Sequence, residues 1–170
     1  MGGEAVSRPP GWRNGRRRPT LRGMAGCAVQ LPLLALDVGM RRIGVAVCDA
    51  LGIGCRGIAC LDRGAPDWPE QVCRRATEYR CRGIVIGLPR NMDGSSGAQA
   101  EDCRRAAGEL AAVCPLPIHF QDERLSSWEA KARLFAQGYS EKRVRKLLDQ
   151  TAAAVILESF LARNVAPDHG

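Results

Sequence analysis

The stretch Leu33-Leu34-Ala35-Leu36-Asp37-Val38-Gly39, continued by Arg41-Arg42-Ile43-Gly44-Val45-Ala46-Val47, indicates two neighbouring strands joined by a tight turn. A carboxylate is unusual at the tip of an apolar strand, because removing its charge from water is costly. Asp37 therefore either binds something, for which a divalent metal ion is the leading candidate, or simply forms the turn before Gly39. This segment alone leaves both interpretations open.

Positive charge is concentrated at the amino-terminal end of the chain. The 170 residues carry a formal net charge of +7, and residues 1–30 hold six arginines against one glutamate. The remainder is close to neutral, so the overall charge says little about its ligand. We expect residues 1–30 to form a disordered basic extension and residues 31–170 to form one domain that is long enough to bury a core.

The basic extension has three possible explanations. Met24 lies shortly before the first expected strand, so translation could begin there rather than at Met1. Alternatively, residues 1–23 could be a nucleic-acid-binding arm or an arginine-rich transit peptide.

Cysteine spacing argues against a zinc site and against a disulfide scaffold. The eight cysteines form no Cys-x-x-Cys pair, and only two histidines are present. Disulfide-dense domains are usually much smaller than this one, so we expect a reducing, cytoplasmic location. The sequence has no run of about 18 apolar residues and no apolar leader, and we therefore expect no membrane partner.

Strand and helix patterns alternate along the body and predict an α/β fold with a central five-stranded mixed sheet flanked by helices. Ser96 and Ser126 each begin a pattern typical of a capping box. The strands are expected at Leu33–Asp37, Ile43–Cys48, Arg56–Leu61, Gly83–Gly87 and Pro117–Gln121, and the helices at Trp68–Arg80, Ser96–Val113, Ser126–Gln137 and Ser140–Ala162.

Further acidic residues stand where this topology could bring them towards Asp37. Asp122 and Glu123 end the fifth strand and, as neighbours, would point to opposite faces of it, so only one need face a site. Asp149 lies among alanines and large apolar residues of the last helix, where a charge is out of pattern, although an ion pair with Arg145 would also explain it. Several carboxylates are what a two-metal phosphodiester site requires.

Two basic or polar segments could contact phosphate groups. The loop from Gly87 to Ser95 follows a buried strand, where open α/β sheets place ligands, and its Arg90 can pair with phosphate. A second group gathers at the start of the last helix, at Lys142, Arg143, Arg145 and Lys146. An ordinary surface loop and a solvated helix face are the alternative explanations.

Four stretches of the sequence occur in a fixed order. They are Leu36-Asp37-Val38-Gly39 with Arg42-Ile43-Gly44-Val45-Ala46-Val47-Cys48-Asp49, then Gly87-Leu88-Pro89-Arg90-Asn91-Met92-Asp93-Gly94-Ser95, then Asp122-Glu123-Arg124-Leu125-Ser126-Ser127, then Asp149-Gln150-Thr151-Ala152-Ala153-Ala154-Val155-Ile156-Leu157. Together they resemble the YqgF/RuvX family of RNase H-like proteins, which are described as pre-16S rRNA nucleases and Holliday-junction-resolvase-like proteins. The resemblance implies an RNase H-like fold and a metal-dependent endonuclease that processes the 5′ end of precursor 16S rRNA during ribosome biogenesis.

The same resemblance implies roles for individual residues. Asp37, Glu123 and Asp149 would be catalytic and would hold Mg²⁺ or Mn²⁺, with Asp37 bridging two ions and Asp122 as a substitute for Glu123. Attack of a water would leave a 3′-hydroxyl and a 5′-phosphate. The family often has Glu where Ser96 stands here. The residues expected to bind nucleic acid are Arg41, Arg42, Arg90, Asn91, Arg124, Lys142, Arg145 and Lys146.

Two other functions stay open. The chain could be a non-catalytic assembly factor that binds rRNA without cutting it, or a Holliday-junction resolvase acting on branched DNA. A resolvase would be an obligate dimer, whereas the absence of a long apolar dimer helix in the sequence favours a monomer or a weak homodimer. His119 could shuttle protons, although a histidine in a strand is more often packed or solvated.

Overall fold

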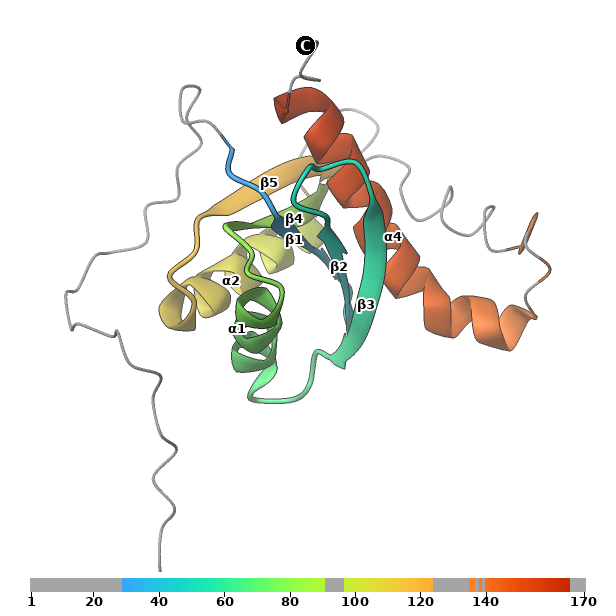
Figure 1. Ribbon diagram of the computed structural model, residues 1–170. Coiled ribbons are helices and arrows are strands. Elements are labelled where there is room, and N and C mark those ends of the chain that lie inside the picture. Colours follow the sequence, from blue (N-terminus) through green and yellow to red (C-terminus); the bar gives the residue numbers. More distant parts are fainter. Residues whose placement is uncertain (1–28, 91–96, 124–134, 137, 139, 166–170) are drawn as a thin grey trace, which may run out of the picture.

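The protein is described by a computed structural model that covers residues 29–90, 97–123, 135–136, 138 and 140–165, with the side chains of 141–151 left out of the description. In this part of the chain a five-stranded sheet lies between helices on both of its faces (Figure 1). Residues 1–28 of the expected extension and most of the expected helix at 126–137 fall outside the described residues.

The sheet combines an antiparallel meander with two parallel strands. The three strands of the meander are joined by short turns, which permit only antiparallel pairing, whereas each parallel strand is reached through a helical crossover. The spatial order is β3-β2-β1-β4-β5. The strands are β1 (Leu33–Val38), β2 (Arg42–Cys48), β3 (Cys55–Asp62), β4 (Gly83–Pro89) and β5 (Ile118–Glu123).

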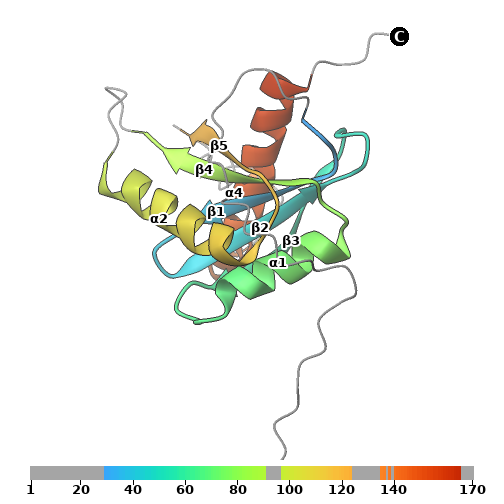
Figure 2. The same ribbon diagram turned by 90° about the vertical axis from the view of Figure 1, so that its left-hand side faces the viewer.

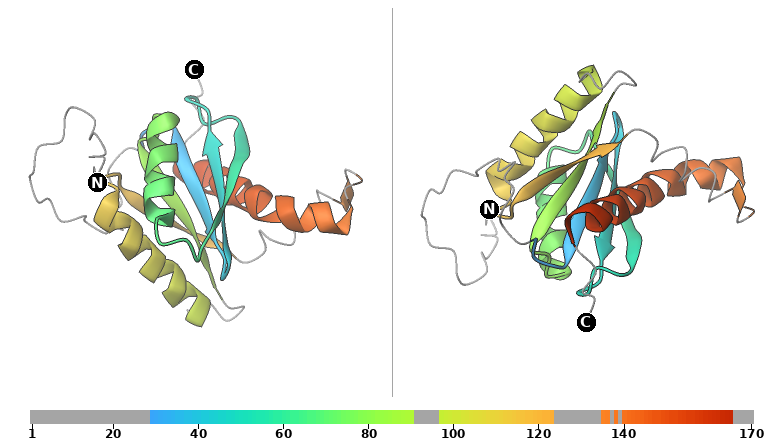
Figure 3. Two further views of the ribbon diagram at one scale, coloured as in Figure 1. Left: turned by 90° about the horizontal axis from the view of Figure 1, so that it is seen from below. Right: turned by 90° about the horizontal axis from the view of Figure 1, so that it is seen from above.

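The helices divide between the two faces of the sheet. Helices α1 (Trp68–Glu78) and α2 (Ala98–Val113) cover one face, and α4 (Glu141–Asn164) covers the other (Figure 2). Helix α4 crosses the sheet, and its first turns extend past the edge strand β3 (Figure 3). This order, with β4 and β5 parallel to β1 and helices on both faces, is the RNase H-like fold that the sequence predicted.

Each face of the sheet has its own apolar core, and β1 contributes to both. Leu34, Leu36 and Val38 are buried in the cluster that α1 and α2 cover. Leu33 and Ala35 are buried in the cluster with residues of α4, such as Ile156 and Leu157. A strand that is buried on both faces has a continuous apolar sequence rather than an alternating one. This explains why the first four residues of β1 are all apolar.

The start of α2 differs from the prediction. The helix begins at Ala98, and Gly97 is its N-cap, with an extended backbone and no side-chain capping bond. The sequence predicts a start at Ser96; the structure begins the helix two residues later, and the Ser96 of the predicted capping box lies outside the described residues. Strand β5 is longer than predicted, because its pairing with β4 continues as far as Pro89 and Glu123.

The seven described cysteines are thiols, and none forms a disulfide within the described residues. Cys81 and Cys114 are buried, and burial raises the pKa of each to about 12. Such thiols act as small apolar core residues. No described helix combines the length and apolar character needed to cross a membrane.

Candidate active site

Asp37 lies at the carboxyl end of β1, on the face covered by α4. The residues before it alternate, so that Leu33 and Ala35 face α4 whereas Leu34 and Leu36 face the other two helices. Alternation places the Asp37 side chain with Leu33 and Ala35. Asp37 is partly buried and lies where the apolar core ends, near the carboxyl end of the strand.

Gly87 of β4 lies beside Asp37 and packs against α4. The parallel pairing of β1 with β4 includes Leu36 and Ile86, and Asp37 and Gly87 are the next residues of the two strands. A Cβ at Gly87 would lie 2.5 Å from Cδ1 of Ile156 and 3.3 Å from Cγ of Glu123. Glycine therefore allows α4 to pack closely on the sheet at this point, where the Ile156 side chain fills the place that a larger residue would need.

Glu123 of β5 lies on the other side of Gly87. Its Cγ atom is close to Gly87 and its side chain is half-buried, so it shares the α4 face with Asp37. Two spacings of about 4.8 Å separate the backbones of β1 and β5, a span of about 10 Å. Carboxylates that share one face of the sheet on the strands either side of β4 could both approach ions bound at this end of the sheet.

Asp122 points to the opposite face from Glu123, as adjacent residues of a strand must. It is paired in the sheet with Leu88, which belongs to the core under α1 and α2. Its Oδ1 lies 3.0 Å from Nε of Arg90, and both side chains are more than one-third exposed. The sequence alone left Asp122 and Glu123 as alternatives, and the fold places only Glu123 on the face of Asp37.

The turn after Asp37 presents two arginines. The backbone N–H of Gly39 donates to the carbonyl of Arg42 over 2.9 Å and closes the turn. A Cβ on Gly39 would lie 2.9 Å from that carbonyl oxygen, so the turn requires glycine. Arg41 and Arg42 are exposed and stand next to the carboxyl end of β1.

Several predicted site residues lie where the structure gives no side chain. Asn91 and Arg124 fall outside the described residues altogether. Asp149 lies in α4, seven residues before Ile156 and therefore about 10 Å along the helix from it, but its side chain is not described. The same holds for the basic residues of the first turns, which are Lys142, Arg145 and Lys146.

His119 is packed and stands away from the acidic pair. Its ring centroid lies 5.4 Å from that of Phe160, and Nε2 lies near Gly83 at the start of β4. Burial lowers the pKa of this imidazole. Glu123 follows four residues later, about 13 Å along the strand, so His119 is the packed strand histidine rather than a proton shuttle.

The described acidic pair fits part of a metal site. Carboxylate oxygens are the ligands that Mg²⁺ and Mn²⁺ prefer, and nucleases that use two metal ions hold them between such groups. Within the described residues, no group of three or more His, Cys, Asp and Glu side chains could hold an ion. Asp37 and Glu123 could supply two ligands, and a metal site here would need at least one more group from outside the described side chains.

Comparison with known proteins identifies the family. The family model described as "RuvX: Holliday junction resolvase" matches residues 32–163. This chain belongs to the RuvX family. A protein of Synechococcus elongatus named "Putative pre-16S rRNA nuclease" is 43% identical over 137 residues, which cover 79% of this chain and 91% of that protein. A protein of the same name from Azotobacter vinelandii is 40% identical over 136 residues, covering 79% and 95%.

Membership of the RuvX family makes the chain a nuclease, a hydrolase that cleaves phosphodiester bonds. Among solved structures, Thermus thermophilus RuvC matches with a TM-score of 0.42 and 15% identity, over 78% of this chain and 96% of that one. The fowlpox virus Holliday junction resolvase matches with a TM-score of 0.39 and 15% identity, over 75% and 94%.

Proposed function

We propose that this RuvX-family protein is a metal-dependent endonuclease of the cytoplasm that trims the 5′ end of precursor 16S rRNA during ribosome biogenesis. The observation that carries the proposal is the placement of Asp37 and Glu123 on one face of the sheet, on either side of the side-chain-free position Gly87. The names of the relatives support the choice of precursor 16S rRNA as substrate.

The carboxylates of Asp37 and Glu123, with Asp149 as the third ligand, would hold Mg²⁺ or Mn²⁺. When bound, such ions polarise the phosphate and lower the pKa of a water. The sheet holds the backbones of Asp37 and Glu123 in place through the hydrogen bonds that pair β1, β4 and β5. Their carboxylates would therefore need little rearrangement to bind a metal ion. The buried apolar residues beneath them exclude water from the protein side.

Arginines near the acidic pair would hold the RNA backbone. Arg41 and Arg42 are exposed beside Asp37 and can pair with phosphates. Arg90 lies just beyond β4 and pairs with Asp122 at 3.0 Å, on the face away from the acidic pair; its remaining N–H groups could contact a phosphate that passes the end of the sheet. The other proposed contacts are Asn91, Arg124, Lys142, Arg145 and Lys146.

The test is cleavage of a model precursor carrying the 16S 5′ extension, with Mg²⁺ or Mn²⁺. Wild type would be compared with Asp37→Asn, Glu123→Gln and Asp149→Asn, with Glu70→Gln as a matched control on the exposed side of α1. Each of the three site variants is expected to lose at least 100-fold in cleavage rate, because a metal ligand is removed, whereas Glu70→Gln retains the wild-type rate.

Two outcomes would replace this proposal. Tight RNA binding with no wild-type cleavage in either metal would favour a non-catalytic assembly factor. A resolvase would be favoured if the protein cut a four-way DNA junction faster than the RNA and light scattering showed a dimer. A resolvase needs two active sites because it cuts two strands of the junction. Cleavage that survives all three substitutions would remove these carboxylates from the mechanism.

A further inference from the structure

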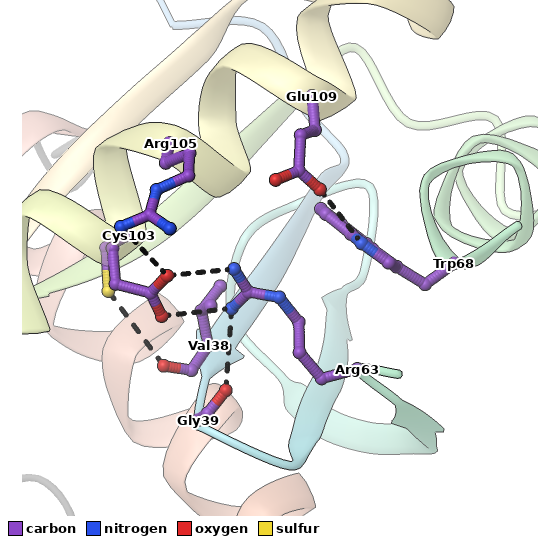
Figure 4. Close-up of polar contacts among 8 residues, drawn as sticks. Val38, Gly39, Arg63, Trp68, Cys103, Arg105 and Glu109 are labelled. Carbon is purple, nitrogen blue, oxygen red and sulfur yellow. Dashed lines mark hydrogen bonds and ion pairs between the residues drawn. The ribbon is translucent and has the colours of Figure 1, made fainter. Parts of the chain in front are cut away.

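Arg63 is a mostly buried cation that the mechanism above does not use. It follows β3, and its side chain is 12% exposed. Figure 4 shows its guanidinium between Gly39 of the turn after β1, Trp68 at the start of α1, and helix α2. A charge in such a position must be satisfied from several sides.

The guanidinium forms a bidentate ion pair with Asp102 of α2. Nη2 lies 3.2 Å from Oδ1 and Nη1 lies 3.3 Å from Oδ2. The guanidinium carbon also lies 5.6 Å from the centre of the Trp68 ring, a cation–π contact. The indole N–H of Trp68 in turn donates to Glu109 over 3.2 Å. These contacts fix the arginine between two helices in one orientation.

The same residue holds the turn that follows Asp37. Its Nη1 donates to the carbonyl of Gly39 over 3.5 Å, and its backbone N–H donates to the carbonyl of Arg41 over 2.9 Å. Together with the Gly39–Arg42 bond that closes the turn, these contacts hold the turn at both its first and its last residues.

A second contact from α2 holds the residue between Asp37 and Gly39. The thiol of Cys103 donates to the carbonyl of Val38, with a sulfur–oxygen distance of 3.9 Å (Figure 4). Burial, and then the charges of Asp102 and Asp37, raise the pKa of this thiol to about 11, so it keeps the proton it donates. The backbone carbonyls of Val38 and Gly39, which follow Asp37, are thus both held by side chains on the face of the sheet opposite α4.

We infer that Arg63, held by Asp102, is a positioning residue for the active site: it fixes the Val38–Arg42 turn and thereby sets the direction of the Asp37 carboxylate towards the metal ions and of Arg41 and Arg42 towards the substrate. The inference rests on the proposed function of Asp37 as a metal ligand. Replacement of a group that hydrogen-bonds a metal ligand typically changes metal affinity or activity by about 10- to 100-fold; Arg63 acts through the backbone of the turn, so we expect an effect near the lower end of that range.

The test measures Mn²⁺ binding by titration calorimetry on the full-length protein, together with kcat and KM for the precursor RNA and the melting temperature. Arg63→Met and Asp102→Asn are each expected to raise the Kd for Mn²⁺ by about tenfold or more. Arg63→Lys keeps the charge but not the fork of two donors and is expected to fall between Arg63→Met and wild type.

The matched control is Arg74→Met. Arg74 forms an exposed ion pair with Asp67 at 3.6 Å, with side chains 69% and 55% exposed, and its loss is expected to leave the Kd for Mn²⁺ within twofold of wild type. A role of Arg63 in folding alone would lower the melting temperature and leave the Kd unchanged. An unchanged Kd in a folded Arg63→Met protein would overturn the inference. If Arg63→Met does not fold, an unchanged Kd in both Asp102→Asn and Arg63→Lys would overturn it.

Metal binding separates this inference from the proposed function. If the wild type binds Mn²⁺ but does not cut RNA, the nuclease proposal fails, and the Kd values of the variants still decide the role of Arg63. A wild-type protein that binds no Mn²⁺ would overturn both.

Discussion

Replacement of Gly87 by alanine tests the packing that brings the acidic pair together. The added Cβ would lie 2.5 Å from Cδ1 and 3.1 Å from Cγ1 of Ile156, and 3.3 Å from Cγ of Glu123. Ile156 is 1% exposed, so its side chain has little room to move. Overpacking of this kind costs about 1–3 kcal/mol, while the loss of glycine flexibility in the unfolded chain offsets about 0.5–1 kcal/mol.

Ile156→Val supplies the compensating change, because it removes Cδ1, the atom nearest to the added methyl group. By itself it should cost about 0.5–1.5 kcal/mol, as usual for a buried isoleucine. In combination with Gly87→Ala the loss should be smaller than the sum of the two single losses, by about 1 kcal/mol, because the two changes share one contact.

Urea unfolding of the wild type, the two single variants and the double variant measures this coupling. Gly108→Ala in α2 is the control, since nothing lies within 4 Å of the position of its Cβ, and it should stabilise the protein by about 0.5–1 kcal/mol. Cleavage by Gly87→Ala should also fall, because the methyl group displaces Glu123. The close packing of α4 on β4 would be refuted if the loss of unfolding free energy in the double variant equalled the sum of the two single losses within about 0.5 kcal/mol. It would also be refuted if Gly87→Ala were as stable as Gly108→Ala.

Three further outcomes follow from particular contacts. The unfolding free energy of the wild type should fall as the pH drops below about 6.5, because burial lowers the pKa of His119 and only the unfolded chain then takes up a proton at this residue. His119→Leu should flatten the plot of unfolding free energy against pH between pH 7 and 5. An unchanged slope in that variant would contradict this. Gly39→Ala should lose about 1–3 kcal/mol in urea unfolding, because its Cβ would lie 2.9 Å from a backbone oxygen; a variant as stable as wild type would show that the turn can shift. Arg74→Met should change stability by less than about 1 kcal/mol, since its ion pair is exposed, and a larger loss would point to contacts beyond that pair.

Much of the fold could be predicted because the signals were local. The apolar runs, the glycines between them and the amphipathic pattern of Trp68–Glu78 depend on neighbours in the sequence, and all five strands and the helices α1, α2 and α4 formed close to their predicted positions. The boundaries were less accurate: α2 begins at Ala98 rather than at Ser96, because the ends of a helix depend on contacts beyond the local spacing of residues.

The candidate site divides in the same way. The chain itself determined which carboxylates are candidates, because an aspartate ending an apolar strand and a pair of acids at Asp122 and Glu123 are visible in any reading of the sequence. Only the tertiary structure decided which of these two shares a face with Asp37, since that follows from the register of β5 against β4. It alone revealed Gly87 as the point where Ile156 of α4 packs on the sheet and Arg63 as a residue that holds the turn. These roles arise from contacts between residues far apart in the sequence, such as Arg63 and Asp102, 39 positions apart, and no local pattern predicts them.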